Sequence, residues 1–168
     1  MSSAERVTLT AASCREIDNW IAKYPAEQRQ SAVMAALRIA QEQNGGWLHQ
    51  DLLQAVADYL DMAVIAVYEV ATFYSMYELE PVGRHKISIC TNISCLLCGS
   101  EEVVAHFEKS LGIKLGESTA DGRFTLKEVE CLGACVNAPM AQVGRDYYEK
   151  LTPETIDALL DQLRRDAS

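Results

Sequence analysis

Hydrophobic residues in the first half of the chain recur three or four positions apart, which is the spacing of one face of an α-helix. Three segments before residue 61 follow this pattern: residues 13–21, 27–43 and 49–60. Ser13 followed by Glu16 matches a capping box at the start of the first segment, and Asn44-Gly45-Gly46 ends the second. We therefore expect the chain to begin with a bundle of helices.

Residues 62–74 are apolar nearly all round a helix, with Glu69 as their only charge. The run is too short to cross a bilayer, which takes about 20 residues. It is either a helix of the core or one that docks against a partner, and periodicity alone favours the core. Pro81-Val82-Gly83 then predicts a domain boundary. We assign residues 1–80 to the helical bundle and residues 81–168 to a second domain.

The second half changes to short alternating segments with helices between them. Residues 85–90, 123–130, 140–143 and 147–148 are predicted as strands, and residues 99–111 as an amphipathic helix. A last helix begins near residue 153, with Thr152 as its cap and Pro153 at its first position. Helices followed by strand-helix-strand-strand-strand-helix indicate an α+β protein.

Composition narrows the setting. The net charge of −9 argues against nucleic acid or an anionic membrane as a partner, and its ordinary role is solubility. No stretch is long enough to span a bilayer, and residues 1–6 lack the layout of a secretory signal. We expect a cytoplasmic protein without direct membrane insertion. In that reducing compartment, clustered cysteines are metal ligands more often than disulfides.

Five of the six cysteines gather around two uncharged loops, and three ligand sets compete. Cys95 and Cys98 with Cys131 and Cys135 give a zinc-like pattern. Cys90, Cys95 and Cys98 with one later cysteine give the plant-type ferredoxin spacing, which leaves a later cysteine unexplained. Cys90 and Cys95 with Cys131 and Cys135 take two ligands from each strand-to-loop transition. We prefer this third set.

The same loops favour an iron–sulfur centre over zinc. A [2Fe–2S] centre takes two thiolates on each iron, which suits two separate loops, and Gly99 and Gly133 allow a close approach of the backbone. Residues 90–100 and 131–143 contain no charge and no histidine. An added electron would meet no nearby cation in an acidic protein, so we predict a low reduction potential. Zinc remains the alternative, because thiolate tetrads bind both metals.

Three longer motifs are specific in combination: E-V-A-T-F-Y-S-M-Y at residues 69–77, C-T-N-I-S-C at 90–95 and E-C-L-G-A-C-V-N-A-P-M at 130–140. They resemble the thioredoxin-like [2Fe–2S] subunit of the NADH dehydrogenase module of respiratory complex I, over about residues 17–163. The resemblance implies a helical bundle followed by a thioredoxin-like α/β domain that carries the cluster. Its cluster ligands fall on Cys90, Cys95, Cys131 and Cys135. Cys98 and Cys14 lie outside the motif and are expected to be free thiols.

The resemblance also implies a function. A partner subunit binds NADH and FMN, and the cluster of this chain lies near that flavin but off the main chain of clusters that leads to quinone. The implied partners are this flavin- and NADH-binding subunit and the iron–sulfur subunit of the same module, at the cytoplasmic side of the inner membrane. This chain shows no glycine-rich dinucleotide fingerprint of its own, so we expect FMN and NADH on the partner.

Three other functions stay open at this point. The equivalent subunit of an NAD-linked hydrogenase or formate dehydrogenase shares the same signatures. A zinc-stabilised interaction module would use the same thiols for a structural metal. A thioredoxin-type thiol redox protein would need a C-x-x-C at the start of a helix, and only Cys95 and Cys98 offer that spacing.

Overall fold

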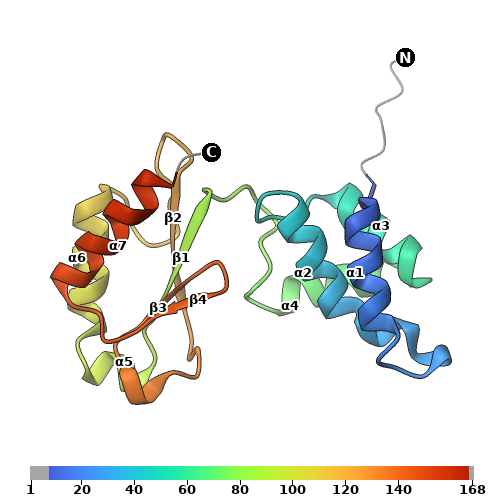
Figure 1. Cartoon of the computed structure of the whole chain (residues 1–168), viewed down its shortest axis with the longest axis horizontal. Coiled ribbons are helices and arrows are strands. Elements are labelled where there is room, and N and C mark those ends of the chain that lie inside the picture. Colours follow the sequence, from blue (N-terminus) through green and yellow to red (C-terminus); the bar gives the residue numbers. More distant parts are fainter. Residues whose placement is uncertain (1–7, 167–168) are drawn as a thin grey trace. The chain divides into compact units, whose positions relative to one another are not determined.

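The computed structural model describes residues 8–166 of the chain, which form two compact units (Figure 1). The first unit ends at Pro81 and the second begins at Val82, within the Pro-Val-Gly segment. Each unit has a hydrophobic core of its own. None of the helices in the described part of the chain is long and apolar enough to cross a membrane.

The first unit is entirely helical. Its elements are α1 (Ala11–Ile21), a 3₁₀ helix η1 (Ala26–Ala32), α2 (Val33–Gln43), α3 (Gln50–Leu60) and α4 (Val64–Phe73). The apolar stripes of α1, α2 and α3 meet in a core whose side chains are almost fully buried, among them Ile17, Leu37, Leu52, Val56 and Leu60. The hydrophobic periodicity of the sequence thus produces the expected bundle.

Two details of the expected bundle are wrong. Thr10, not Ser13, caps α1, because the Thr10 hydroxyl accepts the backbone N–H of Ser13. The Ser13 hydroxyl instead donates to Gln43 of α2, at 2.8 Å. The single helix expected over residues 27–43 is divided, because η1 has non-helical dihedral angles at Gln28 and α2 begins only at Val33.

The expectation that residues 62–74 form an ordinary core helix is also wrong. Only Val67 and Ala71 of α4 are buried. Its other large apolar side chains, and those directly after it, are exposed: Val64, Ile65, Tyr68, Phe73, Tyr74 and Met76. Contiguous exposed apolar surface of this kind is typical of a binding face rather than of a core.

The second unit contains a four-stranded mixed sheet in the order β2-β1-β3-β4. Its strands are β1 (His85–Cys90), β2 (Phe124–Val129), β3 (Ala141–Val143) and β4 (Asp146–Tyr148). β1 and β2 are parallel, with Cys90 opposite Val129, whereas β3 is antiparallel to both β1 and β4. The four strands predicted from alternation are all present.

Helices α6 (Ser100–Leu111) and α7 (Pro153–Arg165) pack against the same face of this sheet (Figure 1). The core between them contains Phe107 from α6, Ile156 and Leu160 from α7, and Ile87 from β1. α7 begins with the expected cap, since the Thr152 hydroxyl accepts the N–H of Thr155. Two short helices in the cysteine loops, α5 (Ile93–Leu97) and the 3₁₀ turn η2 (Cys135–Asn137), were not expected.

His85 makes the stability of the second unit depend on pH. Burial lowers the pKa of His85, with a further contribution from Arg84, and its Nε2 atom is buried without a hydrogen-bond partner in the described structure. The unfolded chain takes up this proton near pH 6.5 while the folded chain stays neutral, so stability falls as the pH decreases through that value. We expect wild type to lose more free energy of unfolding between pH 7.5 and 5.5 than His85→Asn, by denaturant titration. Parallel pH profiles would contradict this.

Candidate metal centre

Both cysteine loops start at the same edge of the sheet. Cys90 is the last residue of β1, and Cys131 lies two residues beyond Val129, the last residue of the parallel neighbour β2. Because parallel strands end on the same side of a sheet, the chain delivers both loops to one end of the unit. Figure 1 shows α5 and the loop that contains η2 at that end.

Cys90 and Cys95 form a buried pair. The two side chains are hydrogen-bonded to each other, and they pack with Met140 in a small apolar cluster. The backbone N–H of Cys90 donates to the carbonyl oxygen of Met140 at 3.1 Å, which fixes the end of β1 against the second loop. Burial raises the pKa of the Cys95 thiol to about 11, and the hydrogen bond with Cys90 adds to this rise. The pair is therefore withheld from water and from adventitious oxidants.

Cys131 and Cys135 form the second pair, and both are exposed. Their Sγ atoms lie 3.3 Å apart, and the N–H of Gly133 points at the Cys131 sulfur from 3.4 Å. The hydrogen bond with Cys131 raises the pKa of Cys135, whereas a hydrogen bond from Ser94 of α5 opposes this rise. The Ser94 contact joins the two loops directly.

The two pairs also interact with each other. Cys135 feels the charge of both Cys90 and Cys95, so the four sulfurs form one electrostatic group drawn from two loops. Within residues 8–166, no three His, Cys, Asp or Glu side chains converge on a point that a single metal ion could occupy. Two pairs of soft thiol donors in uncharged loops are the donor set that a [2Fe–2S] centre takes, with two thiolates on each iron. The residues present fit that group.

The remaining two cysteines lie apart from this arrangement. Cys98 is exposed and caps the C-terminal end of α5, and none of the contacts found among the four sulfurs includes it. Cys14 is half-buried in α1 of the helical unit. Neither takes part in the pairs.

The structure adds two features that sequence patterns did not predict. Carboxylates of β2 and its exit hold the first loop, because Thr91 donates to Glu128 and Asn92 donates to Glu130. Large apolar side chains of both loops face solvent around the thiols: Ile93, Leu96, Leu97 and Val136. We call these four residues the apolar rim. The sequence signals this rim only through the lack of charge in the two loops.

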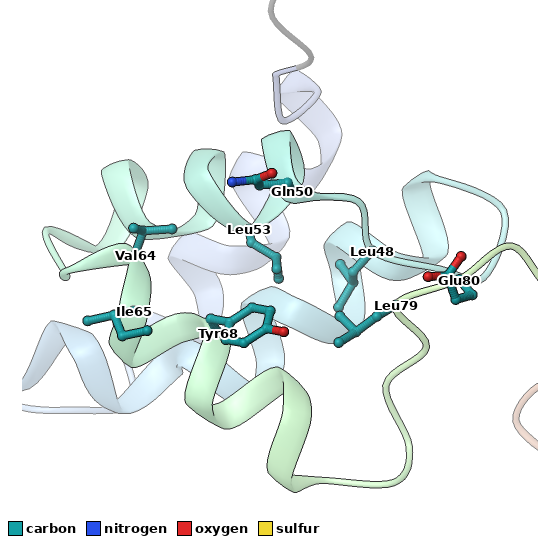
Figure 2. Close-up of a pocket in the computed structure, with 8 residues that line it drawn as sticks. All are labelled: Leu48, Gln50, Leu53, Val64, Ile65, Tyr68, Leu79 and Glu80. Carbon is teal, nitrogen blue, oxygen red and sulfur yellow. The ribbon is translucent and has the colours of Figure 1, made fainter.

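The helical unit has a second candidate site, an apolar groove of about 570 Å³ between α3 and α4. Figure 2 shows Leu53, Tyr68 and Leu79 among the side chains that line it, with Gln50 and Glu80 as polar members. Glu80 is the only charged residue among those that line the groove, which therefore lacks the convergent polar groups of an active site. It is suited to binding rather than to chemistry.

A parallel strand pair that gathers four thiols at one sheet edge, backed by two helices, defines a protein that holds a soft metal centre on a sheet scaffold. Comparison with known families makes the class specific. Residues 17–164 match the thioredoxin-like [2Fe–2S] ferredoxin family, and the chain belongs to this family. The expected α+β fold with a thioredoxin-like [2Fe–2S] domain is thereby confirmed.

Individual relatives agree with this assignment, and both are subunits of NADH-quinone oxidoreductases. The chain is 50% identical over 146 residues to the one of Rickettsia bellii (strain RML369-C), covering 87% of each chain. It is 49% identical over 149 residues to the one of Rhizobium meliloti (strain 1021), covering 89% of this chain and 87% of that one.

A solved structure shares the fold. It is an NAD⁺-reducing [NiFe]-hydrogenase in the H₂-reduced state, similar with a TM-score of 0.67 and 22% identity over 79% of this chain and 22% of the hydrogenase chain. This likeness concerns the fold alone.

Proposed function

We propose that this chain is the electron-transfer subunit of an NADH–quinone oxidoreductase, and that Cys90, Cys95, Cys131 and Cys135 hold its [2Fe–2S] cluster. The observation that carries the proposal is the gathering of these four thiols, in two pairs, at one sheet edge. Identity of 50% to an NADH-quinone oxidoreductase subunit, over 87% of both chains, supports it. When bound, a [2Fe–2S] cluster takes up and returns one electron at a time.

The protein residues prepare this site in two ways. The buried pair Cys90 and Cys95 excludes water on the sheet side, whereas Cys131 and Cys135 are exposed and leave the other side accessible to a partner. The uncharged loops offer no cation to stabilise an added electron, so the potential is low. Entry and exit of the electron on the exposed side follow from this asymmetry.

The apolar rim supports a docked partner at that exposed side. Leu97 is 83% exposed and Val136 is 97% exposed, next to the thiols rather than scattered over the surface. Solvent-facing apolar side chains around a redox site favour contact with another protein surface. We infer that the flavin- and NADH-binding subunit covers the rim and brings its flavin near the cluster.

The helical unit supports a second contact. The exposed face of α4 and the adjacent groove supply apolar surface that the unit itself does not cover. We assign this face to the same assembly, as a contact for the flavin-binding subunit or for the iron–sulfur subunit of the module. Assembled in this way, the chain lies at the cytoplasmic side of the inner membrane, as a peripheral member of the complex.

Metal analysis of the anaerobically purified chain tests the cluster. We expect about two irons and two acid-labile sulfides per chain, and an S = 1/2 EPR signal after reduction, as a [2Fe–2S] centre requires. A colourless protein with one equivalent of zinc would instead support the structural-metal alternative. Co-purification with a hydrogenase or a formate dehydrogenase, rather than with quinone-reducing subunits, would support the related diaphorase function.

A further inference from the structure

The hydroxyl of Ser100 is a buried polar group without a partner. Ser100 is the first residue of α6, its side chain is fully buried, and its Oγ atom makes no hydrogen bond within the described part of the chain. An unpaired buried donor costs about 1–3 kcal/mol. Buried hydroxyls in native proteins nearly always have a partner, so this one indicates a group that the protein chain alone does not supply.

The position of Ser100 in the fold directs this hydroxyl toward the candidate cluster. Ser100 shares the inward face of α6 with Val103 and Phe107, three and seven positions later, and both of these pack on the sheet. The Cα–Cβ bonds of a helix tilt toward its N-terminus. α6 starts at the edge where β1 ends and returns toward the start of β2. The Ser100 side chain therefore points to the end of the sheet where the two cysteine loops lie.

The other polar side chains of the first loop are already engaged. Thr91 donates to Glu128, Asn92 donates to Glu130, and Ser94 is hydrogen-bonded to Cys135. Ser100 is thus the one hydroxyl between residues 90 and 100 whose hydrogen-bonding capacity remains unused in the described structure. Neither a lysine nor an arginine lies in either cysteine loop.

We propose that the Ser100 hydroxyl donates a hydrogen bond to a sulfur atom of the [2Fe–2S] cluster and thereby raises the cluster's reduction potential. The proposal rests on the proposed function, since it needs the cluster to be bound. Reduction adds one negative charge to the cluster, and a donor aimed at its sulfur stabilises the reduced form more than the oxidised form. In loops without a cation, this dipole is one of the few stabilising groups available.

Redox titration of the full-length protein, followed by EPR, tests the contact. We expect Ser100→Ala to have a lower midpoint potential, so that at a fixed applied potential its ratio of reduced to oxidised cluster falls by about threefold or more, within the range of an ordinary hydrogen bond. Ser100→Thr keeps the hydroxyl and should titrate close to wild type. Ser110→Ala, in the last turn of the same helix, is the matched control and should not shift.

Each outcome decides the question. An unchanged potential in Ser100→Ala, or a Ser110→Ala variant that shifts equally, overturns the proposal. Loss of native circular dichroism in Ser100→Ala also overturns it, because the hydroxyl would then serve the fold. Loss of the cluster from a folded Ser100→Ala protein, with the cluster kept in Ser100→Thr, supports the contact. A wild-type protein without iron would be a failure of the proposed function itself, and it is detected before any variant is compared.

Discussion

Replacing any one of the four paired cysteines with serine is expected to remove the [2Fe–2S] cluster almost completely. The variants are Cys90→Ser, Cys95→Ser, Cys131→Ser and Cys135→Ser. Each leaves one iron with a single thiolate from its pair, and a serine hydroxyl is a harder and far more weakly acidic donor than a thiol. Iron and sulfide per chain should fall from about two of each toward zero, with loss of the visible absorption.

Cys98→Ser is the matched control for this series, since it makes the same chemical change in the same loop. Cys98 is exposed at the end of α5 and lies outside both pairs, so the variant should keep its full iron content and its EPR spectrum. The assignment is wrong if Cys98→Ser loses the cluster while Cys90→Ser retains it. That result would restore the ligand set of Cys95, Cys98, Cys131 and Cys135, which the sequence also allowed.

The elements that sequence patterns predicted well are those whose pattern is decided locally. α7 combines a cap at Thr152, a proline at its first position and a regular apolar stripe, and each of these features is stabilising without help from the rest of the fold. α1 shows the limit of such reasoning. Ser13 is a suitable cap in isolation, but Thr10 takes that role and the Ser13 hydroxyl binds Gln43, a residue thirty positions away.

Other features could not be predicted because they depend on what the sequence does not encode locally. The apolar composition of α4 is the same whether its surface faces a core or a partner, so hydrophobicity alone favoured the wrong alternative. α5 is five residues long, which is too short for a periodic signal. At the candidate site, spacing predicted which thiols would be neighbours, and the structure brings those pairs together. It did not predict the carboxylate contacts of the first loop, the apolar rim or the unpaired hydroxyl of Ser100.

Removing the two most exposed members of the apolar rim should abolish docking of the flavin-binding partner. Leu97 and Val136 are both almost fully exposed, so the double variant Leu97→Gln/Val136→Gln has little to lose in the free protein. Burying an apolar side chain of this size contributes about 1.5–3 kcal/mol. Losing two such contributions should weaken binding by about a hundredfold or more. The measurement is the affinity for the isolated flavin- and NADH-binding subunit, together with the rate at which NADH reduces the cluster.

The glutamine substitutions add no charge, so the midpoint potential should stay close to wild type and a slower reduction can be attributed to docking. Ala105→Gln, on the exposed side of α6, controls for a new glutamine outside the rim. Phe73→Gln tests the exposed face of α4 in the same assay. If only Phe73→Gln weakens binding, the flavin-binding subunit docks on the helical unit and the rim is not its contact. If both weaken it, the partner holds the chain at both surfaces, and the rim sets the distance over which the electron passes.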